Sequence, residues 1–368
     1  MLWLFWSLLA FDSGIVKYSE TEFFQPLRKS DIAVGPRGDV YVLHYAEAKV
    51  LHYAPDGTPL PAISQKGQGP GELSFPMSIT FQDGKLFVPD RGSDSIKIFD
   101  PDGKIIESVR MPNGAELAKT RGGWAIGKWG GALSPDTRAS ISWSDESLAN
   151  NLTVYEWDNS QDGGRVEVRR TPGGSMEFPY NPATDRSFMV GSPGGSLVFL
   201  STPGPFKIVV FDMDQKKLVG TVERSEQAAR FNEDWGLKRI GELNETNKAK
   251  GAPIKFVPNF PEYFPLIRDM YVSQEGQLVI EKWSVSPDRV NDILVLDRHG
   301  NPAKLPYDPR HEGRVAAILD GNAYVTLFDA EADQAEVARV PMTEVDAFLN
   351  ENPIEFEGFT GRLMVRSQ

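Results

Sequence analysis

The chain has 368 residues, no cysteine and a formal net charge of −12 at pH 7. The missing cysteines exclude disulfides, thiolate metal ligands and cysteine nucleophiles. The acidic balance argues against a nucleic-acid partner, because such a surface repels a phosphate backbone. With 34 glycines, 27 prolines and 11% aromatic residues, the composition favours an all-β fold with many tight turns.

The first eleven residues are apolar except for Ser7, and they include no lysine or arginine. This run is too short to cross a bilayer and has the length of the apolar part of a secretory signal peptide. A typical signal peptide begins with basic residues, which are missing here, and Asp12 also departs from the usual pattern. A start codon assigned too far downstream would explain both departures. The alternative is that the apolar run is a buried first strand or helix. We expect residues 1–14 to be a truncated signal peptide and the protein to be periplasmic or extracellular, with a cytoplasmic location as the alternative. No integral membrane segment is expected in the remainder.

Two stretches of the chain align without a gap, Gly38 to Gly57 and Gly84 to Gly103, at an offset of 46 residues (84 − 38). Each copy contains a glycine turn, an apolar run, a polar break, an alternating run and a Pro-Asp-Gly turn. These are the signals of two β-hairpins per copy. Four short strands in a repeat of this length are typical of a β-propeller blade.

Further glycine turns followed by apolar runs extend the repeat along the chain and predict six blades of four antiparallel strands. The longer spacing between blades three, four and five predicts insertions, of which the largest, at about 225–265, is compatible with a helix ended by prolines. We expect this partly helical insertion between blades four and five to be a cap over exposed edges or a lid over a ligand. The six turns begin at Gly38, Gly84, Gly122, Gly195, Gly276 and Gly321.

Closing the ring requires a fourth strand for blade six, which otherwise has strands at 314–319, 323–328 and 336–340. We expect the N-terminal segment Ile15 to Phe24 to supply it, because an open ring would leave strand edges free; residues 354–365 are the competing candidate. The predicted organisation is therefore a propeller over 15–342, followed over 343–368 by a C-terminal helix and tail that pack on it, with the helix at about 343–350. We expect a monomer.

The stretch Gly67-Gln68-Gly69-Pro70-Gly71-Glu72-Leu73 and the strands and Pro-Asp-Gly turn that follow it resemble one NHL repeat nearly end to end. The resemblance is close over about 31–110 and moderate over 267–306. The chain is therefore similar to the bacterial six-bladed NHL-like or TolB-like propellers, many of them exported and uncharacterised. The resemblance implies the fold; it implies little about activity, because propellers host binding platforms, lyases and lactone hydrolases.

Positions just after strand two of each blade should gather at one mouth of a propeller channel. Aromatic walls with a few polar groups are typical of a small-molecule or peptide site. Alternatively, the aromatic side chains pack between sheets and the charged ones pair with each other in solvent. A one-residue slip of the alignment in blades three to six would reverse which side chains face the channel. The candidate ligand-binding rim is His44, Tyr45, Asp90, Arg91, Lys128, Trp129, Lys282 and Trp283. The remaining equivalents are Ser201 and Thr202 in blade four and Leu327 and Phe328 in blade six.

Three of these rim side chains are cationic and only Asp90 is anionic. Such a rim would attract a carboxylate or an acidic peptide, and its tryptophans could stack on a sugar. We therefore expect a binding module for a small anionic or carbohydrate ligand, a peptide or a protein, without a cofactor.

The alternative is a metal-dependent lyase or lactone hydrolase that uses the channel. The chain has four histidines, and the repeat alignment places His52 and His299 away from the channel, so a multi-histidine zinc centre is not expected. A single divalent cation such as Ca²⁺ near Asp90 and His44 remains the enzymatic alternative. No nucleophile elbow, phosphate-binding loop or HExxH helix is present. The sequons at Asn151 and Asn244 match a short pattern with many false positives.

Overall fold

The structure is a computed structural model. It describes residues 15–18, 27, 29–112, 115–128, 138–158, 169–170, 176–183, 187–192, 195–249, 251–287, 292–329 and 334–353. The chain divides into two compact units. Unit 1 comprises Met1–Ala115, Ser144–Asn150 and Leu305–Glu355, and unit 2 comprises Glu116–Trp143, Asn151–Lys304 and Phe356–Gln368.

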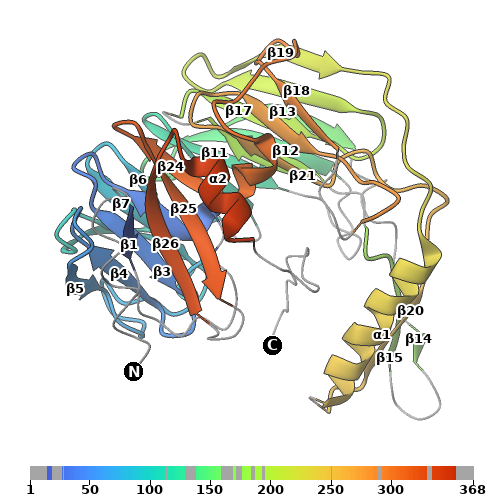
Figure 1. Cartoon of the computed structure of the whole chain (residues 1–368), viewed down its shortest axis with the longest axis horizontal. Helices are drawn as coiled ribbons and strands as arrows, with labels where there is room; N and C mark the ends of the chain where they lie inside the picture. Colours follow the sequence, from blue (N-terminus) through green and yellow to red (C-terminus); the bar gives the residue numbers. More distant parts are fainter. Residues whose placement is uncertain are drawn as a thin grey trace. The chain divides into compact units, whose positions relative to one another are not determined.

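The fold is all-β and six-bladed, as the repeat predicts (Figure 1). Unit 1 contains blades one, two and six, together with two short 3₁₀ segments, η1 (Lys29–Asp31) and η2 (Pro309–Arg314). Blade one is β2 (Ile32–Val34), β3 (Val40–His44), β4 (Lys49–Tyr53) and β5 (Pro59–Ile63); blade two is β6 (Thr80–Gln82), β7 (Lys85–Asp90), β8 (Ser95–Phe99) and β9 (Ile105–Arg110); blade six contains β24 (Val315–Leu319), β25 (Asn322–Asp329) and β26 (Gln334–Pro341).

The fourth strand of blade six comes from the other end of the chain. Strand β1 (Val16–Tyr18) pairs antiparallel with β26, with Tyr18 opposite Val337. The hydroxyl of Tyr18 donates to the carbonyl of Pro55 at 3.1 Å, and Arg339 of β26 donates to the same carbonyl at 3.0 Å. The expected N-terminal closing strand is thus confirmed at Val16–Tyr18, whereas the rest of its predicted span, 19–24, and the competing segment 354–365 lie outside the described residues.

Blades three, four and five belong to unit 2 apart from short stretches of blade three. The first two have four strands each, and three strands are described for blade five. Blade three is β10 (Ala115–Thr120), β11 (Gly123–Lys128), β12 (Arg138–Asp145) and β13 (Asn151–Asp158); blade four is β16 (Phe188–Gly191), β17 (Leu197–Ser201), β18 (Lys207–Asp212) and β19 (Lys217–Glu223); blade five is β21 (Asp269–Val272), β22 (Leu278–Glu281) and β23 (Ile293–Leu296).

The glycine that opens strand two has the same backbone conformation in all six blades. Each of these glycines has a positive φ, a region that residues with a Cβ rarely occupy, so the turn depends on glycine. The pattern that aligns the repeats is therefore a backbone requirement. The φ angles are 86° at Gly38, 73° at Gly84, 68° at Gly122, 73° at Gly195, 82° at Gly276 and 74° at Gly321.

The predicted insertion between blades four and five contains α1 (Glu233–Ala249) and β20 (Ile254–Pro258). Strand β20 pairs in parallel with β15 (Met176–Tyr180), and β14 (Arg169–Arg170) completes a three-stranded accessory sheet. Figure 1 shows α1 beside these strands. The side-chain amide of Asn244 on α1 bonds both the N–H of Phe256, at 2.7 Å, and its carbonyl, at 2.9 Å. One of the two sequon asparagines is thus engaged in capping the edge of β20.

The predicted C-terminal helix is observed as α2 (Val345–Glu351) in unit 1. Arg314 fastens it to blade six by donating to the carbonyls of Asn352 at 2.8 Å, Leu349 at 3.2 Å and Thr326 at 3.1 Å. Burial lowers the pKa of the Arg314 guanidinium to about 10. None of the described helices is long and apolar enough to cross a membrane.

The Gly-rich segment that resembles an NHL motif connects blades one and two, as expected. Its Glu72 carboxylate accepts the N–H of Gly69 at 2.9 Å and the amide of Gln65 at 2.8 Å. The N–H of Leu73 bonds the carbonyl of Gln65 at 3.0 Å, and the Leu73 side chain is fully buried in the core between the two blades. These contacts make the segment a closed turn that places the residues after it against the end of β7.

Candidate functional site

In each unit separately, the connection into a blade lies against the end of a second strand. In unit 1, Pro76 of the connection into blade two forms a β-bridge with Asp90 at the end of β7. In unit 2, a pocket is lined both by the loop after β17 and by Leu266 and Ile267, which precede β21. In both units, therefore, the connection into a blade lies beside the end of a second strand.

Asp90 is fully buried, and its carboxylate serves as a structural acceptor. The backbone N–H groups of Ser74, Phe75 and Gly92 donate to it, and the hydroxyl of Ser93 donates at 2.6 Å. These four donors compensate the desolvation of the charge without a basic partner at hydrogen-bonding distance in the described contacts. Asp90 thereby locks the connection from blade one onto blade two.

His44 and Tyr45 also have partners within unit 1. His44 is buried at the end of β3, and its Nδ1 accepts the N–H of Glu47 at 3.2 Å. Burial lowers the pKa of His44, since desolvation disfavours the charged imidazolium. Tyr45 is half-buried, and its hydroxyl contacts the Asp31 carboxylate and the carbonyl of Met77, the latter at 3.2 Å. Both side chains therefore participate in contacts between neighbouring segments.

Arg91 and Lys128 have exposed side chains. Arg91 lies in unit 1, where its backbone N–H donates to the carbonyl of Phe75 at 2.9 Å, and Lys128 is the last residue of β11. Trp129, the neighbour of Lys128, lies outside the described residues. The structure thus places half of the predicted rim in unit 1 and the remaining described members, Lys128, Lys282 and Trp283, in unit 2.

Lys282 lies between two carboxylates. Its Nζ is 2.8 Å from Glu226 and 3.0 Å from Asp292, and only 12% of the side chain is exposed. Hydrogen bonds from Lys282 and Arg224 hold the pKa of Glu226 below its usual range, and the pKa of Lys282 is raised by both carboxylates in spite of its partial burial. The positive charge that sequence analysis offers to an acidic ligand is therefore already neutralised.

Trp283 is 8% exposed and packs in an aromatic cluster. Its ring stacks on Phe264 at 5.0 Å between centroids and meets the edge of Trp235 of α1 at 5.5 Å. The guanidinium of Arg268 lies 5.1 Å from the ring centroid of Trp283. Trp283 thus joins blade five to the helical insertion, which is the packing alternative stated for the rim aromatics.

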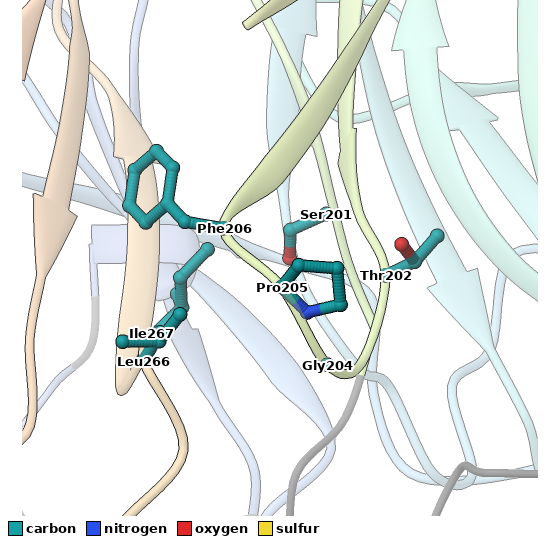
Figure 2. Close-up of a pocket in the computed structure, with 7 residues that line it drawn as sticks. All are labelled: Ser201, Thr202, Gly204, Pro205, Phe206, Leu266 and Ile267. Atoms are coloured by element: carbon teal, nitrogen blue, oxygen red, sulfur yellow. The ribbon is translucent and has the colours of Figure 1, made fainter. Parts of the chain in front are cut away.

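A shallow pocket between blades four and five of unit 2 includes Ser201 and Thr202, the blade-four equivalents of His44 and Tyr45. Its empty space is about 210 Å³ when the open solvent around it is included, and it leaves no room for an enclosed water molecule. Figure 2 shows the hydroxyls of Ser201 and Thr202 on the side of the Pro205 ring, with Leu266 and Ile267 across from them. The lining is Ser201, Thr202, Gly204, Pro205, Phe206, Leu266 and Ile267.

Ser201 is the distinctive residue of this pocket. It is 1% exposed, and its Oγ has no hydrogen-bond partner among the residues that the structure describes. A buried hydroxyl without a partner is destabilising, because it has lost its hydrogen bonds to water. Sequence analysis aligned Ser201 with the rim but did not single it out, since serine there reads as an ordinary small residue.

A carboxyl pair that sequence analysis missed lies at the same end of blade five. Asp269 begins β21 and stands directly opposite Glu281, the last residue of β22. The hydroxyl of Tyr271 donates to Asp269 Oδ2 at 3.0 Å. Burial, and then the charge of Asp269, raise the pKa of Glu281 to about 7. Only the strand register reveals this pair, because its members are twelve positions apart in the sequence.

The four histidines are dispersed. His52 is buried beside Asp39, with 3.7 Å between its Nε2 and the carboxylate, while His311 lies 2.9 Å from Asp346 and His299 is in an exposed turn. Within the described ranges, no group of three or more His, Cys, Asp or Glu side chains is arranged to hold a metal ion.

No protein-family model matches the sequence, and no curated protein matches it significantly. The fold is similar to those of solved structures. A member of the DUF4221 family from Bacteroides vulgatus is 10% identical over 88% of this chain and 95% of its own, with a TM-score of 0.49. A candidate exported protein from Bacteroides fragilis is 13% identical over 89% and 94%, with a TM-score of 0.45. The calcium-binding protein regucalcin from Agrobacterium tumefaciens is 10% identical over 86% and 91%, with a TM-score of 0.40. Identities this low say nothing about a ligand or an activity.

Proposed function

We propose that the protein is an exported binding module of the NHL-like propeller type, which takes a small ligand, a peptide or a segment of a protein at the strand-two ends of its blades. The observation that carries this proposal is the buried, unpartnered hydroxyl of Ser201 in the pocket between blades four and five. Export is supported by the apolar run at the start of the sequence.

The pocket favours a ligand that is largely apolar and carries at least one hydrogen-bonding atom. Pro205, Phe206, Leu266 and Ile267 provide apolar walls, and Ser201 provides a hydroxyl that can donate or accept. A ligand atom bonded to that hydroxyl would remove the cost of leaving it unsatisfied. Because the pocket leaves no room for an enclosed water molecule, a ligand can enter only if the 202–206 loop moves.

The charged surroundings argue for an uncharged or hydrogen-bond-donating ligand over a carboxylate. Lys282 is saturated by Glu226 and Asp292, while Asp269 and Glu281 add acidic character at the adjacent end of blade five. Among the ligand classes offered by sequence analysis, a neutral peptide that carries an apolar side chain therefore fits the pocket better than a carbohydrate or an acidic ligand.

The test is a thermal-shift screen with neutral sugars, carboxylates and short peptides, repeated on two variants. Thr202→Trp places a bulky ring at the pocket mouth, and Arg91→Trp makes the matched change at the equivalent exposed position of blade two. We expect a stabilising ligand to lose its shift in Thr202→Trp and to keep it in Arg91→Trp. A shift retained in both variants would place the ligand elsewhere.

Elemental analysis after dialysis without chelator separates this reading from the lyase or lactone-hydrolase alternative. A stoichiometric divalent cation, with a thermal shift that chelator reverses, would favour the enzyme. A binding module is expected to be unchanged by the chelator.

A further inference from the structure

The Ser201 hydroxyl lies beside a residue that has no backbone donor. Figure 2 shows this hydroxyl next to the ring of Pro205, and Pro205 is exposed to solvent whereas Ser201 is 1% exposed. Proline has no N–H, so this neighbour cannot supply the hydrogen bond that the hydroxyl lacks among the described residues. The unpartnered state of Ser201 therefore belongs to the present position of the loop, and a ligand that bonds the hydroxyl must displace that loop.

Both ends of the loop are fixed. Before it, Ser201 pairs with both neighbouring strands, β16 and β18. After it, Phe206 is 2% exposed in the apolar core shared by blades four and five, and its carbonyl accepts the N–H of Arg224 at 3.2 Å. A movement that uncovers the hydroxyl without breaking these contacts is therefore confined to residues 202–205.

The conformational freedom of residues 202–205 is concentrated at Gly204. Pro203 and Pro205 have φ fixed at about −65° by their rings, and Thr202 precedes a proline, which disfavours helical backbone. Gly204 has a φ of 98°, and a side chain there would meet no other atom within 4 Å. This conformation is easy for glycine and strained for other residues, so a substitution at Gly204 changes the torsional preference without adding a clash.

The pocket suits an uncharged segment that carries an apolar group beside a polar one. Phe206, Leu266 and Ile267 are its apolar walls outside residues 202–205, and none of the described residues that line it is charged. An extended peptide presents each apolar side chain next to backbone N–H and C=O groups, and either group can bond a serine hydroxyl. The segment at Pro205 has the same character and lacks only the N–H. A peptide would therefore replace the apolar contacts of Pro205 and add the missing hydrogen bond.

We propose that residues 202–205 form a lid that swings about Gly204. The group that the open lid admits to Ser201 is the backbone of an extended, uncharged peptide, and an apolar side chain of that peptide takes the place of the Pro205 ring. The peptide rests on the function proposed above, whereas the lid does not. Because the closed lid competes with the ligand, the observed affinity is reduced in proportion to the fraction of molecules in which the lid is open.

The first experiment measures how often the lid opens. The chain has no cysteine, so Ser201→Cys introduces a single thiol into the full chain, and the rate of its reaction with an aromatic disulfide reports the exposure of that position. We expect this rate to rise about five- to thirtyfold when Gly204→Ala is added, because a positive φ disfavours the closed lid once a Cβ is present. Tyr263→Cys, at a position that is 50% exposed, gives the rate of an accessible thiol.

Gly84→Ala is the matched control for the added strain. Gly84 has a φ of 73° in blade two and equally open surroundings, so the substitution imposes a comparable torsional strain outside unit 2. We expect it to leave the Ser201→Cys rate unchanged. Equal rates with and without Gly204→Ala, or the same increase from Gly84→Ala, would overturn the hinge.

The second experiment does not depend on a cysteine variant. Calorimetry measures the binding of acetyl-Gly-Leu-Gly-amide to the wild type, to Pro205→Ala and to Pro203→Ala, which changes the proline of the lid that does not line the pocket. We expect binding to Pro205→Ala to be tighter by up to about tenfold, because two methylene groups fewer compete with the leucine side chain. Binding to Pro203→Ala should stay close to the wild type. Weaker binding to Pro205→Ala would show that Pro205 is a fixed wall and would overturn the lid.

Two further probes test the chemistry of the ligand. Acetyl-Gly-Ser-Gly-amide, which lacks an apolar side chain, should bind about tenfold more weakly than the leucine peptide. Tighter binding of methyl glucoside than of the leucine peptide would overturn the peptide as ligand. If the lid opens in the first experiment but none of these probes binds the wild type or Pro205→Ala, the result counts against the proposed function and leaves the lid standing. Equal binding of the leucine peptide to all three proteins would instead support the proposed function and overturn the lid.

Discussion

Asp90 and Ser201 occupy the same repeat position, the last residue of strand two, in blades two and four. Both are buried, yet the Asp90 carboxylate receives two donors from the neighbouring connection and two from the loop that follows Asp90, whereas the Ser201 hydroxyl has no hydrogen-bond partner among the described residues. The repeat thus fixes the backbone of this position, and the segment that packs against it decides what the side chain does. In blade two the position locks a connection; in blade four it leaves an unused hydrogen-bonding group in a pocket.

In blade five, both the charged and the aromatic member of the expected rim are engaged in internal contacts, as Asp90 is in blade two. Lys282 is neutralised by two carboxylates, and Trp283 is packed under α1. Each follows strand two as the repeat predicts, but neither offers a free recognition group in the described structure. Three substitutions test this division, and their expected effects on stability decrease in the order given.

The largest effect is expected for Trp283→Ala. Truncating a buried tryptophan removes its packing against Phe264 and Trp235, which typically costs about 3–5 kcal/mol. Urea unfolding measures the change, with Tyr263→Ala as the control because Tyr263 is 50% exposed. If the Trp283→Ala protein were as stable as the wild type but defective in ligand binding, Trp283 would be a ligand-binding residue and not a core residue.

A smaller effect is expected for Asp90→Ala, at about 2 kcal/mol. The variant leaves the N–H groups of Ser74 and Phe75 without their acceptor, and each unpaired buried donor costs about 1–3 kcal/mol, less where water can enter. Asp90→Asn keeps one acceptor oxygen and should lose less than Asp90→Ala. If ligand binding falls while the unfolding midpoint is unchanged in both variants, Asp90 is a ligand group after all.

The smallest effect is expected for Ser201→Ala, whose stability should lie within about 1 kcal/mol of the wild type or slightly above it. Removing an unpaired buried hydroxyl also removes its desolvation cost. Affinity for a ligand found in the screen should fall, and titration calorimetry would measure this. A marked loss of stability would show that the hydroxyl has a structural partner and would undercut the proposed site.

Several elements of the fold could be predicted from the sequence. It predicted the six glycine turns, the N-terminal closing strand and the helix in the insertion, because these depend on local backbone preference and on the alternation of apolar residues. It did not predict that Lys282 is neutralised or that Trp283 is packed under α1, since Glu226 and Trp235 come from the insertion and lie about fifty residues away.

The sequence alone therefore determined the repeat, the fold class and the order of the blades. Only the tertiary structure decided which repeat positions are locked and which are open, as at Asp90 and Ser201, and only the strand register brought Asp269 opposite Glu281. The physical reason is that turns and strand patterns are set by neighbours in the chain, whereas burial, hydrogen-bond partners and charge pairing are set by segments that meet only after folding.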